Sequence, residues 1–251
     1  MEDKFFGEDD LVLNTSARIP VCLCIDTSAS MNKILDPASV KLTGEKEFID
    51  GKWWDIVAAG DTLMTEMNKG VNKFYEAIRN DDQAAAACEI AIVSFSDEAK
   101  VASEFSSIEK KEEFSIDVEG ESTQMGNGLE LALDMLQKRK DEYNTNGIEY
   151  YQPWLVIFTD GEPTDSIVKA QTKIREMEDE KKITVFCLAL DSEVNMNILS
   201  TLSKRPALSI KNDKFSEFFE WLGKSVSLVS SSRVGETVKL DMTKLDSWAE
   251  I

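Results

Sequence analysis

The chain has 251 residues, 42% of them hydrophobic, and its 47 acidic residues against 28 Lys and Arg give a formal charge of −19. Such a chain can bury a large core, and no apolar run in it reaches the length of a membrane span. The negative charge disfavours nucleic acid and anionic lipid as partners, because their phosphates are repelled. With no histidine at all, Ser-His-Asp and Cys-His catalysis are excluded, and any metal is expected to be a hard cation held by oxygen.

The N-terminal stretch "MEDKFFGEDD" is acidic and lacks the features of a secretory signal. Four cysteines lie in or beside apolar runs without a C-x-x-C pair: Cys22, Cys24, Cys88 and Cys187. They are interpreted as buried, reduced thiols, which together with the missing signal predicts a cytoplasmic protein. The best candidates for a basic patch are "KRK" at 138–140 and "KK" at 181–182. Both are flanked by acids and are interpreted as solvated helix faces.

Short apolar runs alternate along the chain with longer stretches of helical spacing. The runs predict buried strands at Val21–Asp26, Glu89–Ser96, Trp154–Asp160 and Ile183–Leu190, with an antiparallel edge strand at Ala99–Ser107 and a short strand at Ala207–Ile210. The helical stretches are Asp61–Arg79, Gly126–Lys140, Ser166–Lys181 and Lys214–Val229. This order predicts an α/β fold: a doubly wound, mostly parallel sheet with one antiparallel edge strand and helices on both faces.

Two regions depart from the alternation. An insertion at about 32–60 contains "EFIDGKWW", which predicts a small hairpin docked on the body through Trp53 and Trp54. The polar tail 231–251 is expected to be loosely held, with Trp248 as an anchor. The main domain is therefore expected at residues 18–230.

Polar residues collect where the predicted strands end. In "VCLCIDTSAS" the first strand ends at Asp26, with Ser28 and Ser30 at alternate positions after it. Asp160 ends a second strand, and Thr123 lies in a polar loop that enters a helix. Carboxyl ends of parallel strands share one edge of a sheet, so these five residues are expected to meet. Three hydroxyls and two carboxylates suit magnesium, with manganese or calcium as alternatives, and mainly neutral ligands leave the ion able to attract a partner's carboxylate.

Singly, each residue also fits a simpler role as a helix cap or turn residue, and Glu162 and Asp165 are interpreted as rim charges or caps. Together, "DTSAS", Thr123 in "GEST" and Asp160 in "FTDGEPTD" resemble the metal-ion-dependent adhesion site of von Willebrand factor A domains. The family's usual glycine between the two serines is Ala29 here. The resemblance covers about residues 18–230 and implies a Rossmann-like fold that binds protein partners through a metal and is not an enzyme.

A closer resemblance is to bacterial cytoplasmic members associated with tellurite resistance and stress response. "TDGEPTD", "KKITVF", "LSKRPAL" and "FSEFFEWLGKSVSLVSSSRVGE" carry it, and it implies a partner that is a kinase or phosphatase of the same system. Two alternatives stay open. One is a magnesium-dependent phosphotransferase with Asp26 as nucleophile, although Ser28 stands where such enzymes normally have a second acid. The other is a scaffold whose metal site is unused.

Overall fold

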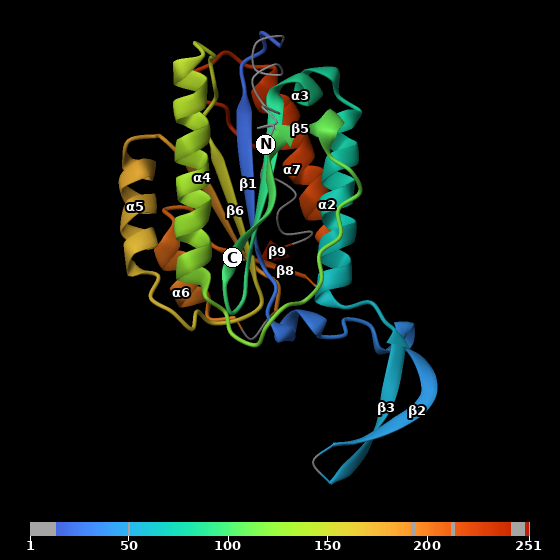
Figure 1. The fold of residues 1–251 in the computed structure, drawn as a ribbon. Helices are drawn as coiled ribbons and strands as arrows, with labels where there is room; N and C mark the ends of the chain where they lie inside the picture. The colour runs from blue at the N-terminus through green and yellow to red at the C-terminus, as the bar shows by residue number, and fades with distance from the viewer. Residues whose placement is uncertain (1–13, 50, 192–193, 212–213, 242–248, 251) are drawn as a thin grey trace, which may run out of the picture.

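The computed structural model describes residues 14–49, 51–191, 194–211, 214–241 and 249–250, and it shows a central sheet between two layers of helices (Figure 1). The strands are β1 (Ile19–Asp26), β2 (Lys41–Ile49), β3 (Lys52–Ala59), β4 (Cys88–Phe95), β5 (Ala99–Ser107), β6 (Trp154–Thr159), β7 (Thr184–Ala189), β8 (Leu208–Ile210) and β9 (Ala249–Glu250). The α-helices are α2 (Leu63–Arg79), α3 (Asp82–Ala87), α4 (Met125–Thr145), α5 (Val168–Asp179), α6 (Met196–Leu202) and α7 (Phe215–Ser230).

The main sheet has the order β5-β4-β1-β6-β7-β8-β9. Neighbouring strands from β4 to β8 run parallel, while β5 on one edge and the short β9 on the other are antiparallel. The predicted mostly parallel, doubly wound sheet is confirmed, including the antiparallel edge strand at Ala99–Ser107. Because β1 pairs with both β4 and β6, the winding direction reverses beside it, and such switch points are where open α/β sheets bind ligands.

Strand β1 is a continuous apolar run because it is covered on both faces. Val21, Leu23 and Ile25 enter one core, and Cys22 and Cys24 enter the other. All four cysteines are buried and free, as the sequence predicted. Burial raises the pKa of the Cys22 thiol to about 12, so this thiol is not reactive at neutral pH.

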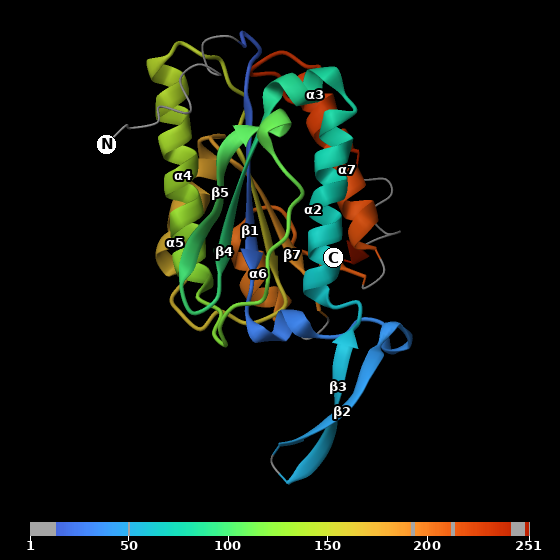
Figure 2. The ribbon, with the colours of Figure 1, turned by 45° about the vertical axis from the view of Figure 1, so that its right-hand side comes forward.

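Helices α2, α3 and α7 cover one face of the sheet, and α4, α5 and α6 cover the other (Figures 1 and 2). The aromatic stripe of α7 packs on the sheet as predicted, with Phe219 stacked on Phe158 of β6 at 5.4 Å between ring centroids. The short helices α3 and α6 were not predicted, because six or seven residues carry too little periodicity to detect.

Strands β2 and β3 form the predicted hairpin, but it projects away from the body beyond the carboxyl edge of the sheet (Figures 1 and 2). The prediction that Trp53 and Trp54 dock it on the body is wrong, since they are 67% and 57% exposed. Consecutive strand residues point to opposite faces, so both indoles could not pack on one surface. Trp53 instead contacts Phe48 of the paired strand, with ring centroids 5.1 Å apart.

The described part of the C-terminal tail packs on the body, although the sequence suggested a loose segment. Tyr151 donates from its hydroxyl to Ser232 O at 2.8 Å, and Trp221 Nε1 donates to Asp241 O at 2.7 Å. The predicted anchor Trp248 lies outside the described residues. Among the residues that the structure describes, no helix has the length and apolar character needed to cross a membrane.

Candidate metal site

The five predicted residues come from the ends of β1 and β6 and from the loop that enters α4. Ile25 of β1 is in register with Phe158 of β6, so Asp26 and Thr159 end their strands side by side. Ser28 and Ser30 follow on the turn that leaves β1, where Ala29–Asn32 form a short 3-10 helix. The structure therefore brings both strand ends to one edge, as the sequence predicted.

Asp26 lies at the base of this edge and is completely buried. Its Oδ1 accepts a hydrogen bond from the Ser28 backbone N–H at 2.9 Å, and its Oδ2 accepts one from Thr159 Oγ1 at 2.7 Å. Desolvation raises the pKa of this carboxyl, while the bonds from Ser28 and Thr159 act in the opposite direction. Asp26 thus fixes the turn that presents the serines, and its negative charge is held at a cost in solvation.

A chain of hydrogen bonds runs from the two serines to Asp160. The Oγ atoms of Ser28 and Ser30 are 3.0 Å apart, and Ser30 Oγ donates to Asp160 Oδ1 at 2.8 Å. Ser28 and Asp160 are buried and Ser30 is exposed, so the chain leads from the protein interior to solvent. Two hydroxyls and one carboxylate oxygen therefore lie together at the surface end of the site.

Thr123 faces the same loop from the other side. Its backbone is tied to Thr164, with Thr164 N–H donating to Thr123 O at 2.9 Å and Thr123 N–H donating to Thr164 Oγ1 at 3.1 Å. A β-carbon added to Gly161 would lie 3.4 Å from Thr123 Oγ1, which places this hydroxyl beside the residue that follows Asp160. The structure shows no hydrogen bond from Thr123 Oγ1 to a described residue, so this oxygen is available to a ligand.

The loop that carries Thr123 is held by the start of α4. Asp165 accepts from the backbone N–H groups of Gly126 at 2.8 Å and Asn127 at 2.9 Å, which confirms its predicted role as a cap. A β-carbon on Gly126 would lie 2.4 Å from Ser166 O, so only glycine allows this close approach. Glu162 accepts from Asn195 Nδ2 at 3.0 Å at the rim.

Asp160 carries the clearest electrostatic signal of the site. Desolvation raises its pKa to about 6, with the Ser30 hydrogen bond acting against this and the charges of Asp26 and Asp191 adding to it. Several buried carboxylates therefore crowd one edge of the sheet, and each disfavours the charge of the others. A cation bound among them would reverse this penalty.

Sequence reasoning missed three contributors to the site. Thr159 donates to Asp26, but in the sequence it is simply the last residue of the apolar run before Asp160. Asp191 lies two residues after the end of β7, and the acid that closes the run "FCLALD" was a usable signal. Lys33, from the start of the insertion, forms an ion pair with Asp191 that no sequence pattern indicated.

The donor set fits a hard divalent cation. Its hydroxyl and carboxylate oxygens are the ligands that magnesium, manganese and calcium prefer. Among the described residues, no three His, Cys, Asp or Glu side chains form a cluster that could hold a metal ion. The candidate site has a different composition, because three of its five predicted ligands are the hydroxyls of Ser28, Ser30 and Thr123, and the other two are the carboxylates of Asp26 and Asp160.

Comparison with known proteins gives one family. The model of the von Willebrand factor type A domain matches residues 54–222, more than half of the chain. The match includes Thr123 and Asp160 but begins after Asp26, Ser28 and Ser30. A search of curated proteins finds no match.

Solved structures share the fold at low sequence identity. A von Willebrand factor type A protein from Catenulispora acidiphila has a TM-score of 0.52 and 13% identity over 85% of this chain and 43% of its own. The PilB minor pilin from Streptococcus sanguinis has a TM-score of 0.53 and 15% identity over 87% and 64%. Proximal thread matrix protein 1 from the mussel byssus, with a zinc-occupied MIDAS motif, has a TM-score of 0.51 and 15% identity over 86% and 47%. The chain spans less than two thirds of each.

Proposed function

Because the chain belongs to the von Willebrand factor type A domain family, we propose that it is a metal-dependent protein-binding module that is not an enzyme. Domains of this family typically mediate protein interactions. Ser28, Ser30 and Thr123 would hold a magnesium ion directly, and Asp26 and Asp160 would supply negative charge, directly or through water. Manganese or calcium would suit the same oxygens. The bound ion would attract a carboxylate from the partner.

The observation that carries this proposal is the position of Asp160, whose buried carboxylate accepts a hydrogen bond from a hydroxyl group at the carboxyl edge of the sheet. Its carboxylate is buried, its pKa is raised to about 6, and its partner is the exposed Ser30 hydroxyl at 2.8 Å. Burying charge beside like charge is unfavourable, so a fold that preserves this arrangement gains from a cation there. The mussel protein, which shares the fold, has a zinc-occupied MIDAS motif, and this supports a divalent metal site in the proposal.

The partner must satisfy two electrostatic conditions at different distances. The chain's charge of −19 repels an acidic protein from afar. A metal with neutral direct ligands, in contrast, demands one anionic oxygen at contact. The expected partner is therefore basic around its contact surface and presents one Asp or Glu to the metal. The resemblance to tellurite-resistance and stress-response members suggests a cytoplasmic partner, a kinase or phosphatase of the same system.

The geometry does not favour the phosphotransferase alternative. A nucleophilic Asp26 would need an accessible carboxylate oxygen, but this side chain is fully buried. Each of its oxygens already accepts a hydrogen bond, from Ser28 N–H and from Thr159 Oγ1. The position two residues later is a serine, which cannot protonate a leaving group efficiently.

The test is binding of the native partner, recovered from the source cytoplasm and then purified. We expect binding to be lost in chelator, to return with magnesium, and to weaken only moderately between low and physiological salt, because screening acts beyond about 8 Å. Thr123→Ala should weaken binding without unfolding the domain, since it removes one hydroxyl. Thr172→Ala, an exposed threonine on α5, is the matched control.

Two results separate the proposal from the scaffold alternative. If the partner binds equally well in chelator and to the Thr123→Ala variant, the candidate site is not the contact. If calorimetry of the isolated chain also detects no magnesium binding, the metal site itself is absent.

A further inference from the structure

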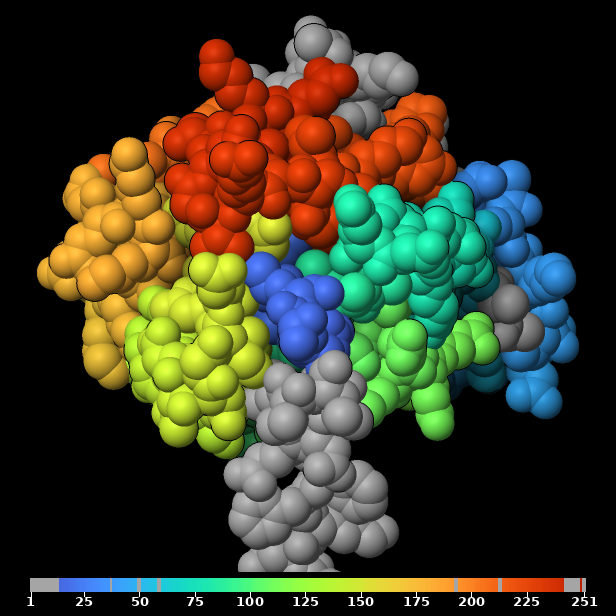
Figure 3. Space-filling view, turned by 90° about the horizontal axis from the view of Figure 1, so that it is seen from above, coloured from blue at the N-terminus to red at the C-terminus, as the bar shows by residue number. Residues whose placement is uncertain are grey.

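One lysine of the basic stretch at 138–140 and both lysines of the stretch at 181–182 lie at the edge of the sheet opposite the candidate metal site. Lys140 lies near the end of α4, and Lys181 and Lys182 lie on the turn between α5 and β7. All three line one cavity of about 540 Å³, together with Arg205. Figure 3 looks onto this edge, where the end of α4 in yellow-green adjoins the C-terminal segment in red. The interpretation of the basic stretches at 138–140 and 181–182 as solvated helix faces therefore needs revision at Lys140.

Lys140 is the residue that a solvated face does not explain. The residue as a whole is only 7% exposed, and the structure shows no ion pair or hydrogen bond from its ammonium group to a described residue. No side-chain nitrogen that is itself fully buried in the described chain lacks a hydrogen-bond partner, so the Lys140 ammonium group reaches the solvent of the cavity. Desolvation, followed by the charge of Lys182, lowers its pKa. The charges of Asp141 and Glu180 act against this shift without preventing it, so further negative charge beside the partly desolvated ammonium group would be favourable.

The other cations of the cavity are held in place by their own contacts. Lys182 Nζ lies 2.6 Å from Glu180 Oε2, and its backbone N–H donates to Met177 O at 2.7 Å. The Arg205 guanidinium lies over the Phe186 ring at 5.4 Å from its centroid. Four cationic side chains thus surround one space in a chain whose total charge is −19.

The remaining walls are largely aromatic and aliphatic. Tyr150, Tyr151 and Trp154 line the cavity on the sheet side, and Val238 and Leu240 line it from the C-terminal segment. Glu236 is the one acidic residue of the lining, and its carboxylate accepts from the Arg233 backbone N–H at 3.1 Å. Apolar walls with a few convergent charged groups are typical of small-molecule sites, which range from about 300 to 1,000 Å³.

We infer that this cavity binds a small organic anion, with Lys140 and Lys182 holding a phosphate or carboxylate group and Tyr150, Tyr151 and Trp154 contacting an aromatic or apolar body. An anion beside Lys140 would give its partly desolvated ammonium group a charge-assisted hydrogen bond, which the structure does not show to any described residue. A polyanionic macromolecule is disfavoured, because the chain as a whole carries a formal charge of −19. The site lies at the amino edge of the sheet, so it is independent of the metal and of the proposed function.

The experiment titrates the full chain, in chelator, with phenyl phosphate, benzoate and inorganic phosphate by calorimetry. We expect one phenyl phosphate per chain, and weaker binding of inorganic phosphate, which lacks the ring. Comparison with benzoate distinguishes a phosphate site from a carboxylate site. In an NMR titration, the amide signals that shift should belong to residues 150–154, 181–184 and 236–238.

Lys140→Met and Lys182→Ala should each weaken phenyl phosphate binding by about tenfold or more, because each removes a charge-assisted contact. Lys182 is exposed, so its variant tests the site even if Lys140→Met disturbs folding. Lys100→Ala is the matched control, since Lys100 pairs with Glu119 outside this cavity. The inference is overturned if none of the probes binds at millimolar concentration, or if both variants bind as wild type does. Tighter binding of hexaglutamate would overturn it in favour of an acidic peptide.

Discussion

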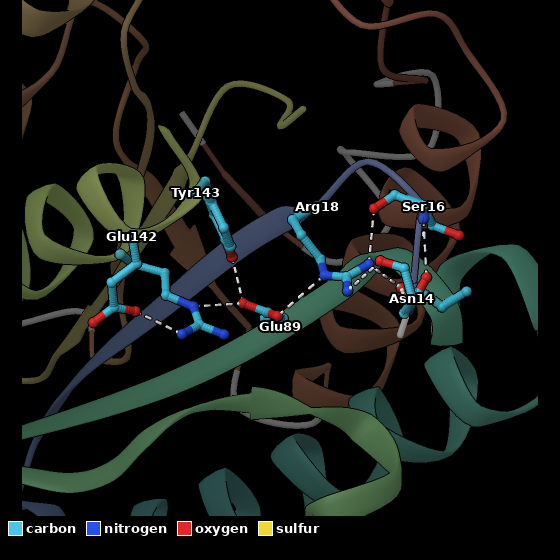
Figure 4. Close-up of polar contacts among 8 residues, drawn as sticks. Asn14, Ser16, Arg18, Glu89, Glu142 and Tyr143 are labelled. Atoms are coloured by element: carbon cyan, nitrogen blue, oxygen red, sulfur yellow. Dashed lines mark hydrogen bonds and ion pairs between the residues drawn. The ribbon is translucent and has the colours of Figure 1, made fainter. Parts of the chain in front are cut away.

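Buried carboxylates occur at both edges of the sheet, but their surroundings differ. At the amino edge, Glu89 at the start of β4 is 3% exposed, with Oε1 3.2 Å from Arg18 Nε and Oε2 2.7 Å from Arg139 Nε (Figure 4). The Tyr143 hydroxyl donates to the same carboxylate. At the carboxyl edge, Asp26 and Asp160 accept only from hydroxyl and backbone N–H groups in the hydrogen bonds that the structure shows.

The Glu89 carboxylate has a structural role, whereas the carboxylates of Asp26 and Asp160 are placed to bind a ligand. Two guanidinium groups neutralise Glu89, and Arg18 in turn donates to the backbone oxygens of Asn14, Ser16 and Ala86. This closed network ties the segment before β1 to β4 and α4. At the carboxyl edge Asp191 pairs with Lys33, but the structure shows no ion pair between Asp26 or Asp160 and a described residue, and the pKa values of both are raised.

The largest loss of stability is expected at the amino edge, where Glu89 is paired with two arginines. Glu89→Gln removes the carboxylate that pairs with both Arg18 and Arg139 in the protein interior, and it leaves Arg139 with Glu142 alone, which should cost about 3–5 kcal/mol of unfolding free energy. Urea denaturation measures this loss. The exposed Glu109→Gln is the control and should change stability little. The stabilisation by magnesium should persist in Glu89→Gln, and its disappearance would show that the two edges are not separate.

At the carboxyl edge, the metal should stabilise the fold. Magnesium or manganese at about 100 times its dissociation constant should add about 2.7 kcal/mol and raise Tm by several degrees. Asp26→Ala and Asp160→Ala should each weaken this shift, because negative charge at the site is lost. Asp134→Ala, on the exposed face of α4, should leave it intact. Thermal unfolding with and without metal measures the shift in Tm. A shift as large as that of wild type in both site variants would refute the assigned site.

The stability of the metal-free protein should depend on pH, because the Asp160 carboxylate forms no ion pair with a described residue. The pKa of Asp160 is about 6 in the fold against 3.8 as its ordinary value, so the folded state binds this proton more tightly. Protonation therefore favours the fold: the contribution is complete below pH 3.8 and is lost as the pH rises through 6. When the pH is lowered from 7.5 to 5, the unfolding free energy of wild type should rise by about 1 kcal/mol more than that of Asp160→Asn, after allowance for solvent screening.

Urea denaturation in chelator at the two pH values measures this difference. Asp26 shifts in the same direction, so Asp160→Asn should reduce the pH dependence without abolishing it. Equal pH dependence in wild type and Asp160→Asn would contradict the raised pKa.

The smallest effect on stability is expected from the hairpin. Its base is fixed to the body, with Leu63 N–H donating to Lys33 O at 3.0 Å and Leu35 N–H donating to Asp61 O at 2.8 Å. Replacing only residues 41–59 by a short Gly-Ser linker keeps these bonds and the Lys33–Asp191 ion pair. Unfolding free energy should then change by about 0.5 kcal/mol or less, because the exposed ribbon adds little to the core.

The same deletion variant should alter partner binding, since the hairpin projects from the edge that holds the candidate metal site (Figure 2). The two effects are measured separately, by denaturation and by titration with the purified partner. Global unfolding would show that Trp53 and Trp54 support the main core after all.

Much of the fold was predictable because local patterns and the final structure agree. The apolar runs ending at Asp26 and Asp160 are strands buried on both faces, and such strands must be continuously apolar. The motif residues were predictable for a related reason: parallel strands end at one edge, so Ser28, Ser30 and Asp160 had to approach one another. Thr159 and Asp191 were missed because a single hydroxyl or acid after a strand has many structural uses.

By itself, the sequence determined the alternation of strands and helices, the oxygen-only chemistry of any metal site and the residues expected to form it. Those properties depend on residue type and on spacing along the chain. Only the tertiary structure decided which charges are compensated, because Arg18 and Arg139 reach Glu89 across 71 and 50 positions of the sequence, respectively. It also decided that the hairpin stands free, and that Lys140, Lys181 and Lys182 share one cavity. Burial and long-range pairing arise from packing, and local pattern does not encode them.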